Sequence, residues 1–259
     1  MTKLRNIKGL LLDLEGVIYS GNKIIDGSIE TIDKLRSNDF IIRYLTNTTT
    51  SPKNKILEKL RSLNLKVSED DIFSPTIAAN EYLKDQKINE IFLLTDKSLE
   101  EDFKNFKIDY ENACAVIIGD IYKDFNWENL NLAFEIINKN DSTIIALHKN
   151  RYCRRDEDLS LDLGPFVAAL EYATNKKAVV MGKPEKNFFS LALKNMELSI
   201  DKVIMVGDDI VSDIGGAKQN NIFSIQVRTG KYQESDESGE FLQPDLRINS
   251  IADLADVLI

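Results

Sequence analysis

Cysteine, histidine and long apolar runs are all scarce in this sequence. Its 259 residues include two cysteines, Cys114 and Cys153, and one histidine. Two distant cysteines form no metal-binding spacing, and they are typical of a reducing compartment. No apolar run approaches the roughly 20 residues that span a bilayer. The first residues, MTKLRNIKG, lack the apolar centre of a signal peptide. We therefore expect a cytoplasmic protein that does not contact a membrane.

Basic residues are also fewer than acidic residues. Against 33 Lys and Arg residues stand 42 Asp and Glu residues, which gives a formal net charge of −9. Because no dense basic patch offsets this charge, nucleic acid is a poor partner for the chain. The length suits one large domain or a domain with a sizeable insertion.

Short apolar runs alternate along the chain with stretches whose apolar residues recur at helical spacing. The first run, Leu10–Leu12, ends on Asp13, and such runs are typical of buried strands in a parallel sheet. Further strands are predicted over residues 40–45, 90–95, 115–119, 143–148, 177–181, 201–206 and 222–227. With the helices between them, they predict an α/β fold.

The alternation restarts in the middle of the chain, which predicts a second α/β unit. We assign residues 1–79 and 179–259 to a core domain with a parallel sheet, and residues 80–178 to an inserted domain. Residues 232–240 are polar and acidic, and they are the one stretch predicted to be prone to disorder.

Four predicted strands of the core end in polar residues. Because the carboxyl ends of parallel strands share one edge, where open α/β sheets bind ligands, we expect these residues to converge. They are Asp13 with Glu15, Thr46 with Asn47, Lys183, and Asp208 with Asp209.

The acidic members of this set suit a metal-dependent reaction on phosphorus. Asp13 and Asp208 supply two hard oxygen ligands, which suit Mg²⁺. A carboxylate such as that of Asp13 can also attack phosphorus and form an aspartyl-phosphate. Asp209 and Asp213 could orient the waters of the metal, and also Lys183, from behind the ligands.

The remaining members suit a phosphoryl group. The Thr46 hydroxyl and nearby backbone N–H groups can hold phosphate oxygens, and Lys183 supplies a permanent positive charge. Taken singly, each residue has an ordinary alternative: Thr46-Asn47 as a turn, Lys183 as a solvated lysine, and Asp208 as a helix cap. Four polar strand ends in this order favour a site.

The motifs around these residues resemble those of a known superfamily. The stretches Asp13-Leu14-Glu15-Gly16-Val17, Thr46-Asn47, Gly182-Lys183-Pro184, and Gly207-Asp208-Asp209 with Asp213 are similar to the four motifs of the haloacid dehalogenase superfamily. The insertion between Thr46 and Lys183 resembles the α/β cap of its nitrophenylphosphatase-like branch, subfamily IIA. The resemblance implies a Rossmann-like core with an inserted cap domain.

The resemblance also implies an activity, that of a Mg²⁺-dependent phosphatase. Such an enzyme hydrolyses a small-molecule phosphate monoester through an aspartyl-phosphate. Asp13 would be the nucleophile and a metal ligand. The main-chain carbonyl of Glu15 and the carboxylate of Asp208 would complete the protein ligands of Mg²⁺.

The substrate side of the site follows from the same resemblance. Leu14, Thr46 and Asn47 would bind the transferring phosphate, together with Asp13 and Glu15, and Lys183 would neutralise it. The cap would decide which substrate is accepted, and the family suggests a homodimer formed through the cap.

Glu15 departs from the superfamily pattern, which has aspartate two residues after the nucleophile as the general acid and base. Glutamate has a similar reference pKa, but its extra methylene moves the acid by roughly an ångström, a shift that can cost on the order of 100-fold in rate. A second hypothesis therefore stands beside the phosphatase: a low-turnover ligand-binding or regulatory protein on a retained scaffold.

The predicted cap carries a basic cluster in the stretch LHKNRYCRR. Its members are His148, Lys149, Arg151, Arg154 and Arg155. The cluster could bind an anion, or it could be a solvated strand edge. The nearby Gly164-Pro165-Phe166 opens a helix that could face an anion or could be an ordinary helix start.

Overall fold

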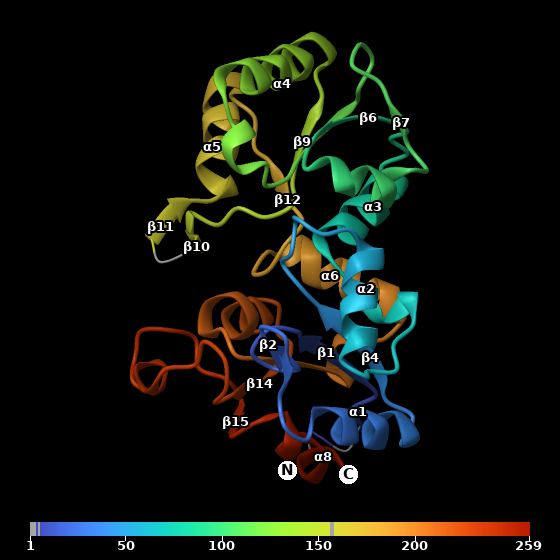
Figure 1. Ribbon diagram of the computed structural model, residues 1–259, viewed down its shortest axis with the longest axis vertical. Helices are drawn as coiled ribbons and strands as arrows, with labels where there is room; N and C mark the ends of the chain where they lie inside the picture. Colours follow the sequence, from blue (N-terminus) through green and yellow to red (C-terminus); the bar gives the residue numbers. More distant parts are fainter. Residues whose placement is uncertain (1–3, 5, 156–157) are drawn as a thin grey trace. The chain divides into compact units, whose positions relative to one another are not determined.

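The chain divides into two compact units in the computed structural model shown in Figure 1, in which residues 4, 6–155 and 158–259 are described. The first unit comprises Met1–Thr46, Asn54–Phe73 and Lys183–Ile259, and the second comprises Asn47–Lys53 and Ser74–Gly182. The predicted boundaries, after residues 79 and 178, lie within a few residues of the ends of Ser74–Gly182, but the prediction placed Asn47–Lys53 in the core.

A six-stranded sheet forms the centre of the first unit, in the order β15-β14-β13-β1-β4-β5. All of its neighbouring strands pair in parallel. Its strands are β1 (Gly9–Asp13), β4 (Ile41–Leu45), β5 (Ile72–Phe73), β13 (Val203–Gly207), β14 (Phe223–Val227) and β15 (Leu246–Ile248). Every residue of β1 and β13 is buried, which explains their unbroken apolar runs.

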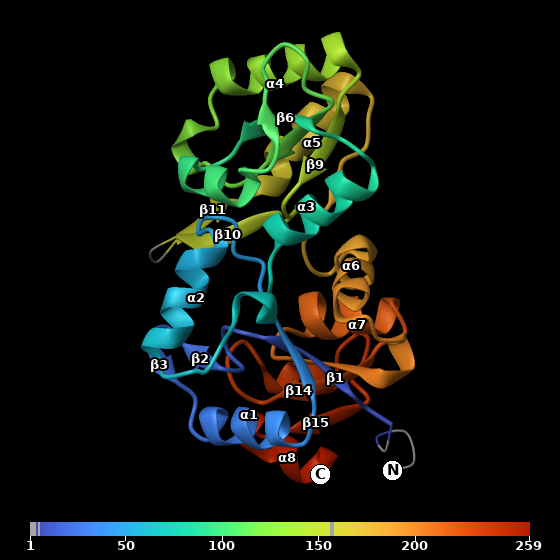
Figure 2. The ribbon, with the colours of Figure 1, turned by 90° about the vertical axis from the view of Figure 1, so that its right-hand side faces the viewer.

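Helices and short turns complete the first unit. They are α1 (Ser28–Ser37), α2 (Lys53–Ser62), α6 (Lys186–Met196), α7 (Gly216–Gln219) and α8 (Leu254–Leu258), with 3₁₀ turns η2 (Glu69–Asp71), η5 (Ile200–Lys202), η7 (Glu234–Glu237) and η8 (Ile251–Asp253) and the π-helical turn η6 (Ile210–Gly215). Helices α1 and α8 lie side by side in both views, in Figures 1 and 2.

Strand β1 is the point at which the strand order reverses. The chain runs from β1 to β4 and β5 on one side, and it later returns to β13, β14 and β15 on the other. Asp13 aligns with Leu45 of β4, and Leu12 aligns with Val206 of β13. The carboxyl ends of these three strands therefore meet at a switch point, where α/β sheets bind ligands.

A small hairpin follows β1. Strands β2 (Tyr19–Ser20) and β3 (Lys23–Ile24) pair antiparallel. Gly21 in the turn has a φ of +59°, a value that glycine adopts without strain.

The second unit has its own parallel sheet, in the order β12-β9-β8-β6-β7. Its elements are β6 (Glu90–Leu94), β7 (Lys107–Ile108), β8 (Ala115–Ile118), β9 (Thr143–Ala146), β12 (Val179–Val180), α3 (Pro75–Asp85), α4 (Trp127–Asn140), α5 (Leu163–Thr174), η3 (Lys97–Phe103) and η4 (Tyr122–Asp124). Helices α4 and α5 pack together and share an apolar core with β8 and β9.

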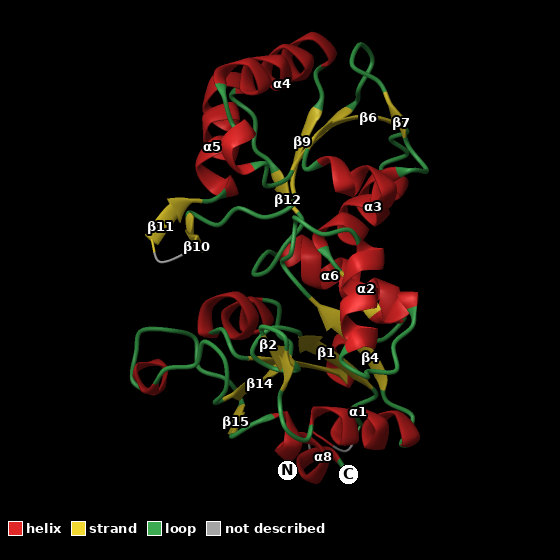
Figure 3. Ribbon diagram, in the orientation of Figure 1, coloured by secondary structure: helices red, strands yellow, loops and turns green. Residues whose placement is uncertain are grey.

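An antiparallel hairpin, β10 (Tyr152–Arg155) with β11 (Asp158–Leu161), lies outside that sheet (Figure 3). It exposes Tyr152, Leu159 and Leu161. A homodimer formed through this unit remains a prediction, and these exposed apolar side chains are compatible with it. No helix in the described part of the chain is long and apolar enough to cross a membrane.

The structure corrects the expectation of disorder over residues 232–240. Within this stretch η7 forms, and Asp236 is buried. The Asp236 carboxylate accepts hydrogen bonds from the Gln233 backbone N–H at 3.1 Å and from the Gln226 side chain at 3.1 Å. The composition of the loop is polar, but a buried partner on β14 satisfies one of its acids.

Removing the second unit should leave a foldable core. A chain in which residues 74–182 are replaced by a short Gly-Ser linker keeps all six strands of the first sheet. We expect a single cooperative unfolding transition, followed by circular dichroism in urea. A chain that melts without a cooperative transition would contradict the division.

Candidate active site

A buried lysine joins two aspartates at the carboxyl edge of the first sheet. Lys183 Nζ donates to Asp13 Oδ1 at 2.5 Å and to Asp213 Oδ1 at 2.6 Å. The side chains of Lys183 and Asp213 are 4% and 0% exposed. Asp13 ends β1, and Asp213 lies in η6, which follows β13. The structure brings these three residues together, as predicted. One premise was wrong, however, because the strand before Lys183, β12, belongs to the sheet of the second unit and not to the core sheet.

The charges of this group are mutually dependent. Burial raises the pKa of Asp13, although the charge of Lys183 opposes it. Burial likewise raises the pKa of Asp213, to about 7, again against Lys183. Burial would lower the pKa of Lys183, but the charges of Asp13 and Asp213 and their hydrogen bonds outweigh it and raise that pKa above its usual value. Lys183 therefore stays positively charged in the interior.

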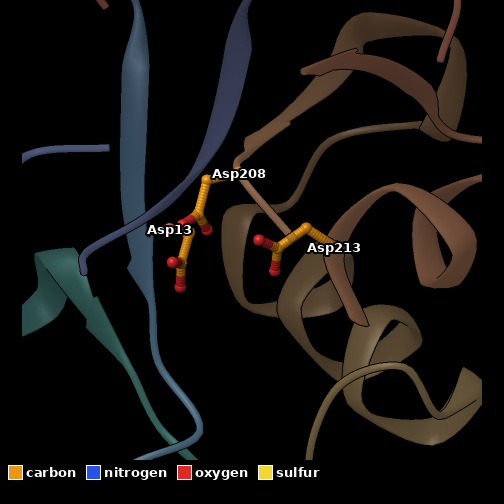
Figure 4. Close-up of side chains that lie close together, drawn as sticks. All are labelled: Asp13, Asp208 and Asp213. Carbon is orange, nitrogen blue, oxygen red and sulfur yellow. The ribbon is translucent and has the colours of Figure 1, made fainter. Parts of the chain in front are cut away.

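Asp208, the residue after β13, lies beside Asp13 and Asp213, as Figure 4 shows. Its Oδ2 accepts a hydrogen bond from the backbone N–H of Lys231 at 2.7 Å. Its Oδ1 is buried and has no hydrogen-bond partner among the described residues. Burial, and then the charge of Asp213, raises the pKa of Asp208 to about 6.

The three aspartates fit a hard divalent cation. Each offers an oxygen atom, and these atoms lie within 4.8 Å of one another. Asp213 has both oxygens engaged, one by Lys183 at 2.6 Å and one by the Asp209 N–H at 3.2 Å. Asp208 Oδ1 is a buried acceptor with no donor in the described part of the protein, which a bound cation would satisfy. Asp13 and Asp208 are therefore the best ligands, and Asp213 holds Lys183 in place.

Thr46 directly follows Leu45, the β4 residue that aligns with Asp13. It is buried, and its backbone N–H donates to the Phe73 carbonyl at 3.3 Å. Asn47 groups with the second unit, so its phosphate-binding role stays a prediction.

Leu14 begins the turn that follows β1. Its side chain is buried, and its carbonyl accepts the Ile18 N–H at 2.9 Å. Contact with substrate through this residue also stays a prediction.

Glu15 is exposed, and its side chain is engaged by the β2–β3 hairpin. Its Oε1 accepts a hydrogen bond from the backbone N–H of Gly21 at 2.7 Å. Burial, followed by the charges of Glu15 and Asp13, raises the pKa of Tyr19 in this hairpin to about 12. Glu15 thus stabilises the hairpin, in addition to any role as an acid.

Asp209 is held by hydrogen bonds to its own turn and to Lys231, and its predicted role in orienting metal waters stays a prediction. Its Oδ1 accepts hydrogen bonds from the backbone N–H groups of Val211 and Ser212, each at 2.9 Å. Its Oδ2 accepts from Lys231 Nζ at 3.0 Å. Asp209 therefore caps η6, and it assists the site by fixing the turn that carries Asp213.

The turn after β14, Thr229–Lys231, was not among the predicted site residues. Thr229 Oγ1 donates to the Gly16 carbonyl at 2.5 Å, and the Lys231 N–H donates to Asp208. The same rule could have found it, because Thr229-Gly230-Lys231 follows a predicted strand at residues 222–227 and should reach the same sheet edge.

Three members of the basic cluster lie against acidic side chains of the second unit. His148 Nε2 lies 3.6 Å from Asp162, Lys149 pairs with Glu171 at 2.7 Å, and Arg155 pairs with Asp120 at 2.6 Å. Burial lowers the pKa of His148, although Asp162 and Asp120 oppose this.

Arg151 is exposed, and the side chain of Arg154 lies outside the described residues. Asp162 caps α5 by accepting the Leu163 N–H at 2.8 Å. An anion facing this helix start stays a prediction.

A parallel sheet whose switch-point strand ends in an aspartate paired with a buried lysine defines the class of the protein. Family models described as haloacid dehalogenase-like hydrolase and HAD-hydrolase-like match residues 10–109 and 180–254. The chain belongs to the haloacid dehalogenase superfamily of hydrolases.

Individual relatives agree with this assignment. The chain is 40% identical to haloacid dehalogenase-like hydrolase domain-containing protein 2 of Pongo abelii, over 92% of the chain and 90% of the relative. It is 34% identical to the human phospholysine phosphohistidine inorganic pyrophosphate phosphatase, over 99% and 96%. The crystal structure of 4-nitrophenylphosphatase from Thermotoga maritima superposes with a TM-score of 0.89 at 27% identity, covering 99% of each chain. The predicted superfamily, the α/β fold and the assignment as a phosphatase-type hydrolase are confirmed.

Removing the buried lysine should cost far more than removing a solvated one. Lys183→Met removes the ammonium group that pairs with the two buried aspartates. We therefore expect this substitution to lower the free energy of unfolding by about 3 kcal/mol. The matched control is Lys231→Met, because the Lys231 side chain is 70% exposed in its pair with Asp209. That loss should stay below about 1 kcal/mol. Urea unfolding of the metal-free proteins measures both values, and equal losses would contradict the central place of Lys183.

Proposed function

We propose that the protein is a Mg²⁺-dependent phosphatase that hydrolyses a small-molecule phosphate monoester at Asp13. The observation that carries this proposal is the arrangement at the switch point. Asp13 is held there by charged Lys183, beside an Asp208 oxygen that has no partner in the described part of the chain. The names of the matched phosphatases support the proposal.

The chain's own residues account for both half-reactions. A carboxylate oxygen of Asp13 forms a bond to phosphorus as the bond to the leaving oxygen breaks, and that oxygen takes a proton from Glu15. Water then attacks phosphorus and gives its proton to Glu15, which releases inorganic phosphate and restores Asp13. Lys183 faces the negative charge throughout. Mg²⁺ held by Asp13, the Glu15 carbonyl and Asp208 would neutralise the phosphoryl oxygens.

A screen of phosphate esters with Mg²⁺ tests this function. The wild-type protein should release inorganic phosphate from at least one class of aryl, sugar or other small phosphate, and a chelator should stop the release. Asp13→Asn keeps the shape of the side chain but removes the nucleophile, so the rate should fall by at least about a thousandfold. Wild-type activity in the Asp13→Asn protein would overturn the role of Asp13. A wild-type protein inactive on every ester would favour the ligand-binding hypothesis.

Glu15 decides between these two hypotheses. An exposed side chain that accepts a hydrogen bond from Gly21 could serve the hairpin alone, as a low-turnover binding protein would allow. Glu15→Gln is the most informative change, because the amide oxygen can still accept from Gly21 while the group can no longer donate an acidic proton.

We expect Glu15→Gln to slow the hydrolysis of an alkyl phosphate at least about tenfold more than that of an aryl phosphate. An alkoxide is a poor leaving group that requires protonation, whereas a nitrophenolate leaves without it. Steady-state rates on the two substrates measure the difference. Equal rates for the wild type and Glu15→Gln on the alkyl phosphate would exclude the acid–base role.

A further inference from the structure

We propose that the Thr229–Lys231 turn is a positioning element for Asp208, which occupies Oδ2 of that carboxylate so that Oδ1 alone is offered to the cation. This turn lies outside the four motifs that resemble the superfamily pattern. The inference rests on the proposed use of Mg²⁺, and it assigns to the turn the choice between Mg²⁺ and a larger divalent cation.

The two oxygens of Asp208 are in different environments. Oδ2 accepts the backbone N–H of Lys231 at 2.7 Å. Oδ1 is buried and lacks a hydrogen-bond partner among the described residues. Because the donor is a main-chain amide, it is fixed by the path of the turn and not by a mobile side chain. The carboxylate therefore presents one oxygen.

Two glycines in left-handed backbone conformation close around this carboxylate. Gly230 has a φ of +64° and Gly16 a φ of +86°. A Cβ atom on either glycine would collide with Asp208 Oδ2. A Cβ on Gly230 would also lie 2.5 Å from the Gly16 Cα. A side chain at either position would displace neighbouring atoms, so both positions favour glycine and both backbones approach Oδ2 closely.

Thr229 holds the turn in place, and Gln226 holds the main chain of Asp208. Thr229 Oγ1 donates to the Gly16 carbonyl at 2.5 Å, which ties the turn to the segment that follows Asp13. The Gln226 side chain, fully buried in β14, donates to the Asp208 carbonyl at 3.3 Å and to Asp236 at 3.1 Å. Asp208 is thus held through both its main chain and its side chain.

A carboxylate held in this way discriminates between cations by geometry. Mg²⁺ requires near-octahedral coordination at about 2.0–2.1 Å, which suits one oxygen from each carboxylate, whereas Ca²⁺ at about 2.3–2.6 Å accepts two oxygens of the same carboxylate. Blocking Oδ2 disfavours the second mode. Loosening the turn should therefore weaken Mg²⁺ binding more than Ca²⁺ binding.

Calorimetric titration of the metal-free, full-length protein with Mg²⁺ and with Ca²⁺ tests this role. We expect Gly230→Ala and Thr229→Val to lower the Mg²⁺ affinity about 10- to 100-fold, as loss of support for a metal ligand does. The Ca²⁺ affinity should change less, so the ratio of the two affinities falls. Thr229→Ser keeps the hydroxyl and should restore the wild-type ratio.

Gly21→Ala is the matched control for backbone strain. Gly21 also has a positive φ, +59°, but a Cβ there would meet nothing within 4 Å, and its N–H is retained. It should leave the ratio unchanged. If Gly230→Ala does not fold, Thr229→Val decides, since it exchanges one hydroxyl for a methyl group.

The outcomes separate the inference from the proposed function. If Thr229→Val and Gly230→Ala lower both affinities by the same factor, or neither, the positioning role is overturned while Mg²⁺ use stands. A wild-type protein that binds no Mg²⁺ overturns the proposed cofactor and the inference with it. A selective loss of Mg²⁺ affinity with serine rescue supports the role.

Discussion

The ion pairs of Lys183 with Asp13 and Asp213 are the interaction on which the site depends. A buried ammonium group is stable only when carboxylates compensate for its lost hydration, and a buried carboxylate has the same requirement. The three groups therefore need one another, and together they fix the end of β1 against η6. They also hold Asp13 beside the Lys183 ammonium group, at the edge of the sheet where a phosphoryl group would bind.

The acids of this site could be predicted because they follow strand ends of one sheet, whereas Lys183 follows a strand of the other sheet. An apolar run that ends on Asp13, and another that ends on Gly207-Asp208, already place two acids at one edge once the sheet is parallel. Strand register then places Thr46 near Asp13, because Asp13 aligns with Leu45, the residue before Thr46. The superfamily motifs lie at these same positions, so pattern and topology agree.

The parts that could not be predicted are those decided by tertiary partners. The acidic loop of residues 232–240 has the composition of a disordered segment, yet Gln226 gives Asp236 a buried partner. In the basic cluster after β9, His148, Lys149 and Arg155 lie against Asp162, Glu171 and Asp120, which are distant in the sequence. Asp209 caps its own turn through Oδ1 and binds Lys231 through Oδ2. No periodicity or local spacing encodes such pairings.

The order of the strands along the chain also affects folding during synthesis on the ribosome. β1 leaves the exit tunnel early, but its neighbour β13 follows about 190 residues later, after the whole segment 74–182. The second unit can therefore complete its sheet before β1 pairs with β13, its second neighbouring strand. Leu10, Leu11 and Leu12, which are buried in the folded protein, therefore gain their second neighbouring strand only late in synthesis.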